Sequence, residues 1–85
     1  MSMDFVLTKH ARQRKNEYRI TVSLIRETLR MPDQVRYDGD GYLMFKKLYV
    51  REGHPHVLIV VCVRSGKTFR IITLITSSKV KKYLS

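Results

Sequence analysis

The sequence is poor in cysteine, in acidic residues and in long hydrophobic runs, and each scarcity excludes a class of protein. The single cysteine, Cys62, rules out an intramolecular disulfide and is typical of a reducing cytosol. The longest apolar run, residues 57–63, is far shorter than the roughly 20 residues that span a membrane. Residues 1–5 lack the basic and apolar regions of a secretory signal. We therefore expect a cytoplasmic protein with no membrane partner and with an inert, buried Cys62 thiol.

Acidic and metal-binding residues are too scattered to favour metal catalysis. Asp38 and Asp40 alternate with glycines, which indicates a turn more strongly than a metal site. His54 and His56 offer two nitrogens but no third ligand is evident, so loop histidines are the better interpretation. No G-x-S-x-G, G-x-G-x-x-G or phosphate-loop pattern occurs. The sequence predicts no metal and no cofactor.

Positive charge is the most pronounced property of the chain. Its 17 Lys and Arg against 7 Asp and Glu give a formal net charge of +10 on 85 residues. Such a field attracts polyanions, namely nucleic acid, an anionic membrane or an acidic protein, although a surplus of charge can also serve solubility alone. The hydrophobic fraction of 44% is typical of a globular protein. With no repeat or linker, residues 1–85 are predicted to form one domain with a small core.

Two short helices are predicted in the first half of the chain. Thr8 is a plausible N-cap for a helix over residues 9–18, and Thr21 for a second helix. The second helix carries apolar residues at helical spacing, at Val22, Ile25 and Leu29. Pro32 ends it near Arg30 or Met31, because a residue that precedes proline disfavours helical geometry.

The remainder predicts four strands that form an antiparallel meander. Strands are expected over residues 35–37, 42–50, 56–64 and 68–76, connected by turns at 38–41, 51–55 and 65–66. Residues 5–7 are interpreted as an extended lead-in, and residues 79–84 as a short helix or a basic tail. The fold class is therefore α+β, with two helices on one face of the sheet and the other face partly open.

Arg70 is the most informative single residue. If Ser65 and Gly66 form the last turn, Cys62 opposes Phe69 and Arg70 shares a face with Ile72 and Leu74. A guanidinium among aliphatic side chains must be paired or exposed to a ligand, because burial of an unpaired charge is costly.

Cleavage of RNA without a metal is chemically compatible with this composition. RNA supplies its own nucleophile, the 2′-OH, so that an enzyme needs proton-transfer groups and cations that stabilise charge on phosphorus. The candidates for catalysis are His10, Arg14, Arg70 and Tyr83, and those for nucleic-acid binding are Lys46, Lys47, Arg64, Lys67, Lys79, Lys81 and Lys82. Structural roles remain open: His10 can pack against the second helix, Tyr83 can border the core, and the lysines can form solvated faces.

Most of the chain resembles a known family. His10-Ala-Arg-Gln-Arg14, followed by Ile20-Thr21 and by a helix that ends at Met31-Pro-Asp33, resembles an uncharacterised domain family whose first helix has the pattern His-Ala-x-x-Arg. That family is similar to the RelE/ParE/BrnT group of small basic toxins, which place two helices against an antiparallel sheet. Lys15 replaces the Met that the family favours, and Tyr18 and Arg19 stand where it has Arg and Gly.

The resemblance implies functional roles for His10 and Arg14. RelE-like toxins cleave messenger RNA, commonly on the ribosome, with basic sheet residues and often a carboxy-terminal Tyr or His, and Arg70 and Tyr83 occupy similar places. ParE-like members act on gyrase instead, so the fold does not fix the target. The leading hypothesis is a metal-independent endoribonuclease with an acidic antitoxin partner. The alternatives are a non-catalytic nucleic-acid-binding module, such as a regulator from a mobile element, and a domain that binds only an acidic protein.

Overall fold

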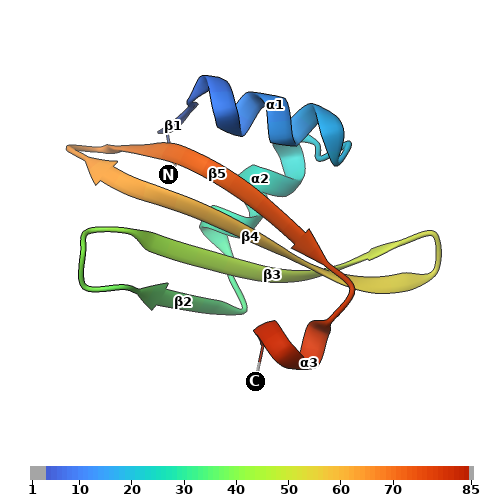
Figure 1. Ribbon diagram of the computed structural model, residues 1–85. Helices are drawn as coiled ribbons and strands as arrows, with labels where there is room; N and C mark the ends of the chain where they lie inside the picture. Colours follow the sequence, from blue (N-terminus) through green and yellow to red (C-terminus); the bar gives the residue numbers. More distant parts are fainter. Residues whose placement is uncertain (1–3, 85) are drawn as a thin grey trace.

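The structure, a computed structural model that describes residues 4–84, is built on one mixed five-stranded sheet (Figure 1). The elements along the chain are β1 (Asp4–Leu7), α1 (Lys9–Glu17), α2 (Val22–Arg30), β2 (Gln34–Tyr37), β3 (Leu43–Arg51), β4 (His54–Ser65), β5 (Thr68–Ser77) and α3 (Val80–Tyr83). The strand order is β1-β5-β4-β3-β2, in which β1 is parallel to β5 and the other pairs are antiparallel. The α+β class is confirmed.

The two predicted N-caps are confirmed and define the starts of α1 and α2. Thr8 Oγ1 accepts a hydrogen bond from the Ala11 amide at 3.2 Å, and Thr21 Oγ1 accepts one from the Leu24 amide at 3.0 Å. Each bond satisfies an amide that has no partner within its helix. The C-cap of α2 is Met31, directly before Pro32, as the sequence predicts.

Two hairpins follow from local turn chemistry. Asp38 Oδ1 accepts hydrogen bonds from the amides of Asp40 at 2.8 Å and Tyr42 at 3.1 Å, which confirms the turn role of the Asp-Gly pairs. Between β3 and β4, Glu52 and Gly53 have φ values of 52° and 79°, as a two-residue hairpin turn requires. This turn is shorter than predicted, and Pro55 lies within β4 opposite Val50.

The predicted antiparallel meander is present as β2–β5, but the sheet is not limited to these four strands, because the expected lead-in is a fifth strand. Residues of β1 pair with β5 in parallel, with Phe5 beside Phe69 and Leu7 beside Ile71. A parallel pair has no connecting hairpin, and its partners here lie near opposite ends of the chain. No local turn pattern in the sequence therefore predicts the pairing of β1 with β5.

The predicted register between β4 and β5 is also wrong. The turn residues are Gly66 and Lys67, so Cys62 lies opposite Ile71 rather than Phe69. A β-bulge in β5, opposite Val61 and Cys62, then shifts the register by one residue. As a result Ile71 and Leu74 are both fully buried on one side, and Arg70, opposite Val63, lies on the other side.

The core fills the space between the sheet and the first two helices. Its buried members are Ala11, Ile20, Ile25, Leu29, Phe45, Leu58, Val60, Cys62, Ile71 and Leu74. The prediction places the helices on one face only, but α3 lies on the opposite face, near the alternate β4 residues Val57 and Ile59, which are also buried. In Figure 1, α1 lies above the sheet and α3 lies below it. None of the helices in residues 4–84 has the length and hydropathy of a membrane span.

Cys62 gives the fold a testable pH dependence. Burial removes the water that would solvate the thiolate and raises the pKa of this thiol from 9.0 to about 11. Because the folded pKa exceeds the unfolded one, this contribution to stability is complete below pH 9.0 and is lost as the pH rises toward about 11. We expect the unfolding free energy of the wild type to fall more steeply over this range than that of Cys62→Ala, by up to about 2–3 kcal/mol. Parallel curves from urea titrations at each pH would contradict the assignment.

Candidate nucleic-acid interface

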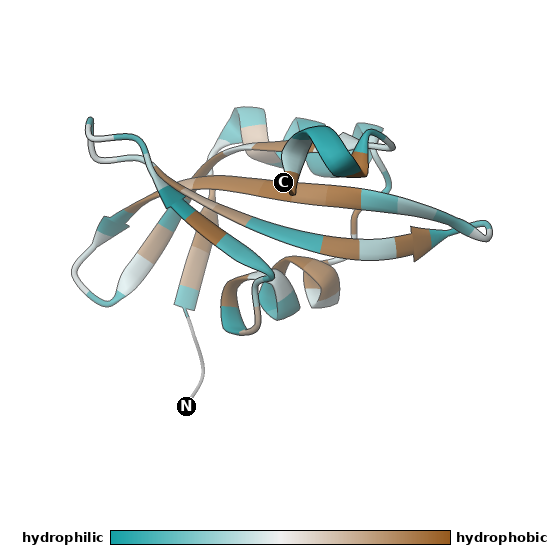
Figure 2. Ribbon diagram, turned by 90° about the horizontal axis from the view of Figure 1, so that it is seen from below, coloured by the Kyte–Doolittle hydropathy of each residue, from teal (hydrophilic) through white to brown (hydrophobic). Residues whose placement is uncertain are grey.

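The face of the sheet opposite α1 and α2 is only partly covered by α3, and we call it the open face. By alternation along the strands and the register between them, its members include Val6, Arg36, Met44, Lys46, Val61, Val63, Arg70 and Ile75. Figure 2 shows long hydrophobic stretches along the strands and a largely hydrophilic α3. Apolar and cationic side chains therefore alternate on this surface.

Arg70 is exposed on the open face, between Val63 on β4 and Val6 on β1. Among the described residues the only ion pair joins Arg14 and Glu17, so Arg70 has no acidic partner there. Of the two predicted outcomes, a paired guanidinium or one available to a ligand, the structure shows the second. Its aliphatic neighbours differ from those predicted, since the bulge in β5 moves Leu74 to the opposite face.

Lys46 links the open face to α3. Its Nζ atom donates a hydrogen bond to the backbone oxygen of Tyr83 at 2.9 Å, which fastens the short helix to β3. An ammonium group has three donors, so this bond leaves capacity for a phosphate oxygen. Lys46 and Arg70 lie two strands apart and about 15–20 Å from each other along the register. They can contact different phosphates of one strand, but not the same phosphate.

The lysines of α3 extend the positive surface. Lys79, Lys81 and Lys82 are exposed, and Lys82 Nζ lies 5.5 Å from the centre of the Tyr83 ring. Tyr83 itself is half-buried. The sequence places these residues in one basic segment, and the structure brings that segment over the same sheet face as Lys46.

The four predicted catalytic side chains do not meet at one point. His10 Nε2 lies 3.0 Å from Thr73 Oγ1, which brings α1 to β5. Arg14 is occupied within its own helix, where Nη1 donates to the Tyr18 hydroxyl at 3.0 Å and lies 3.6 Å from Glu17 Oε2. Tyr83 is on α3, on the opposite face of the sheet from α1. The His-Ala-x-x-Arg pattern thus places one residue at β5 and the other in a local helix contact.

Three predicted nucleic-acid-binding residues lie outside the open face. Lys47 is opposite the core residue Leu58, and its Nζ atom donates to the backbone oxygen of Met31 at 2.9 Å. Arg64 is opposite Phe69, on the face away from Arg70, and its Nε atom donates to the backbone oxygen of Gly66. Lys67 is exposed in the adjoining turn. Arg64 and Arg70 therefore cannot form one phosphate site, because the sheet separates them.

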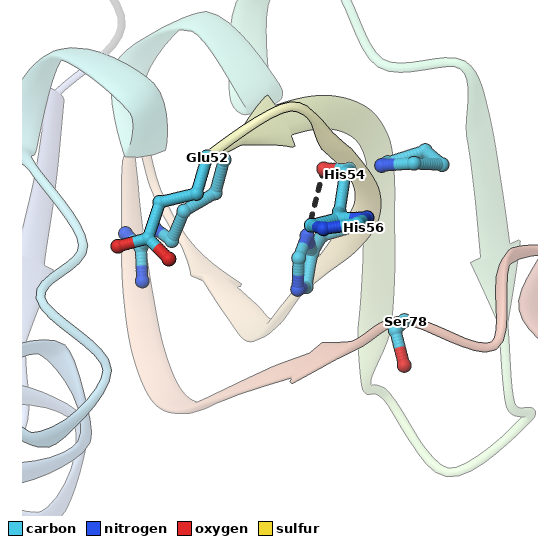
Figure 3. A pocket seen from close by; sticks show the side chains of 6 residues that line it. Glu52, His54, His56 and Ser78 are labelled. Carbon is cyan, nitrogen blue, oxygen red and sulfur yellow. Dashed lines mark hydrogen bonds between the residues drawn. The ribbon is translucent and has the colours of Figure 1, made fainter.

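Sequence reasoning overlooked Arg36, an exposed residue of β2 that lies opposite Met44 on the open face. The sequence does hold a signal for this residue: Arg36 alternates with Val35 and Tyr37 in a short strand before a hairpin, which predicts that it lies on the opposite face from them. It also overlooked a cleft of about 500 Å³ at the end of the β3–β4 hairpin (Figure 3). The residues around this cleft are Arg51, Glu52, His54, Pro55, His56 and Ser78.

In the described residues, no three His, Cys, Asp or Glu side chains gather in an arrangement that could hold a metal ion. Comparison of this chain with family models, with curated proteins and with solved structures found no match.

Proposed function

We propose that this protein is a metal-independent endoribonuclease of the RelE-like toxin class, which binds RNA across the open face. The observation that carries the proposal is the exposed Arg70, placed among apolar side chains and without an acidic partner in the described residues. With Arg36, Lys46 and the α3 lysines it provides cations for successive phosphates, while Met44 and Val61 offer apolar surface to bases. The cytoplasm supplies RNA, free or on the ribosome.

The chemistry follows from the substrate. The 2′-OH of RNA attacks the adjacent phosphorus, and a guanidinium stabilises the additional negative charge better than a neutral donor does. Arg70 has the exposure and the bidentate geometry for this role. His10, which lies on α1 and contacts Thr73 of β5, is the predicted proton-transfer residue. An acidic antitoxin would inhibit the protein by covering the same cations.

A non-catalytic nucleic-acid-binding module is the second candidate. The observation that favours it is the separation of the predicted catalytic side chains, in particular the local contacts of Arg14 with Tyr18 and Glu17. Such a module would bind nucleic acid on the same open face but would not cleave it.

One experiment tests both candidates. A fluorescent single-stranded RNA is titrated with the full chain at several salt concentrations with a chelator present, and the RNA is then resolved on a gel, with ribosomes and without them. We expect affinity to fall steeply as salt rises, because phosphate contacts release counterions, and we expect shorter RNA products. Salt-sensitive binding with intact RNA in both settings supports the second candidate. Binding that does not respond to salt contradicts both.

A further inference from the structure

Tyr42 is an exposed aromatic residue on the open face. It alternates with Met44 and Lys46 along the chain, so its side chain leaves the sheet on the same side as theirs. Tyr42 is 40% exposed. The other exposed aromatic residue among those described is Tyr37, which lies opposite the core-packed Leu43 and therefore on the other face. Of the described aromatic residues, only Tyr42 combines exposure with a place on the open face.

Two hydrogen bonds hold the backbone of Tyr42 in line with β3. Its amide donates to Asp38 Oδ1 at 3.1 Å, and its carbonyl oxygen accepts from the Asp38 amide at 3.1 Å. The second bond continues the β2–β3 ladder one position beyond the pair of Tyr37 and Leu43. A tyrosine ring on a fixed backbone loses little conformational freedom when a ligand stacks on it. The turn therefore presents the ring of Tyr42 as a preformed surface.

The register brings Tyr42 level with Arg70 across the open face. Leu43 lies opposite Cys62 on β4, so one position further along both strands Tyr42 comes level with Val63. Val63 in turn lies opposite Arg70 on β5. Tyr42 and Arg70 are thus two strands apart, at roughly 10–15 Å. Figure 1 shows the β2–β3 and β4–β5 turns at the same end of the sheet. Neighbouring nucleotides of one strand can therefore contact both residues.

Arg36 places a second cation beside Tyr42. It is exposed on β2 and lies opposite Met44, which makes it a diagonal neighbour of Tyr42 on this face. Neither Arg36 nor Arg70 has an acidic partner in residues 4–84, where the only ion pair lies within α1. The nearby carboxylate of Asp38 is occupied by two backbone amides of its own turn. Tyr42 therefore lies between two guanidinium groups that are available to phosphates.

We propose that Tyr42 is the base-stacking residue of the open face, which binds an unpaired stretch of RNA with one base on the Tyr42 ring and a neighbouring phosphate at Arg70. This inference rests on the proposed RNA-binding function and applies whether or not the RNA is cleaved. Every nucleobase has an aromatic face, so stacking adds affinity for any sequence. In a duplex the bases are stacked on one another and cannot reach the ring. The open face thus selects single strands rather than a particular sequence.

The test measures the affinity of the full chain for three labelled ligands of equal length by fluorescence anisotropy. The ligands are a single-stranded 2′-O-methyl RNA, which lacks the 2′-hydroxyl nucleophile and stays intact, the corresponding duplex, and an abasic oligomer with the same phosphates. We expect the wild type to bind the single strand about 5-fold to 100-fold more tightly than the abasic oligomer, because only the single strand can stack. It should also bind the single strand more tightly than the duplex.

Four variants identify the residue responsible. Tyr42→Ala should lower the affinity for the single strand by about 5-fold to 100-fold and leave the affinity for the abasic oligomer within about twofold of the wild type. Its salt dependence should not change, because no phosphate contact is lost. Tyr42→Phe keeps the ring and should bind within about threefold of the wild type. Arg70→Glu should weaken both ligands. The matched control Tyr37→Ala removes an exposed ring from the other face and should change neither affinity, and melting temperatures verify folding.

Other outcomes separate this inference from the proposed function. If the single strand is bound but Tyr42→Ala binds it as tightly as the wild type does, or loses the same factor with the abasic oligomer, Tyr42 does not stack a base. Equal affinity of the wild type for the single strand and the duplex contradicts the selectivity. In each of these cases the inference is wrong and the proposed RNA binding stands. If none of the three ligands is bound, the proposed function itself is wrong.

Discussion

Replacement of Arg70 with glutamate is expected to lower the affinity for single-stranded RNA by about tenfold to a hundredfold at physiological salt. The variant removes one charge-assisted hydrogen bond to phosphate, which contributes roughly 1.5–3 kcal/mol, and adds a repulsive carboxylate to the open face. Since Arg70 is exposed and is not part of the core, the melting temperature should change little. Fluorescence anisotropy with a labelled RNA measures the affinity, and the dependence on salt should become shallower.

The matched control is Arg12→Glu, which makes the same change in net charge at an exposed position of α1, away from the open face. A general electrostatic attraction would be weakened equally by both variants. A local site at Arg70 requires the Arg70 variant to lose considerably more affinity. Equal losses would therefore show that RNA is attracted by the overall charge and would remove Arg70 from the interface.

Leu74→Ala is expected to destabilise the fold by about 2–5 kcal/mol, because Leu74 is fully buried and its loss leaves a cavity in a small core. Such a loss is a large fraction of the stability of a domain of this size, about 5–15 kcal/mol. The neighbouring Ile75, which is 39% exposed on the open face, provides the control. Ile75→Ala should cost less than about 1 kcal/mol by urea unfolding.

This pair of variants also tests the bulge in β5. Without the extra residue, Leu74 would share a face with Arg70 and would lie outside the core formed with α1 and α2. A small effect of Leu74→Ala and a large effect of Ile75→Ala would place Leu74 on the open face and Ile75 in the core, and would contradict the observed register.

The elements that sequence reasoning located correctly are those that short-range chemistry determines. Thr8 and Thr21 identify helix starts because their hydroxyls bond to amides three residues later. Asp38 identifies a turn for a similar reason, since its carboxylate accepts from the amides that follow it. In each case the whole interaction lies within about one turn of chain and can be inferred from neighbouring residues.

The features that it missed depend on contacts between distant segments. α3 lies on the open face and is joined to it by the bond from Lys46 to Tyr83, a contact between distant residues that no local pattern predicts. The bulge was missed because residues 71 to 75 of β5 are nearly all apolar. Hydrophobicity therefore does not show that Ile71 and Leu74, three residues apart, both belong to the core. The histidine cleft was missed because the Gly53 and Pro55 signals suggested a loop, whereas β4 already begins at His54.

The parallel pairing of β1 with β5 has a consequence for synthesis. A ribosome makes β1 near the beginning and β5 near the end, so Leu7 has no strand partner until Ile71 has left the exit tunnel. The sheet must therefore close late, after the four antiparallel strands have begun to assemble. Until β1 pairs with it, one edge of β5 has unpaired backbone groups, the feature that makes a free strand edge prone to pair with other chains.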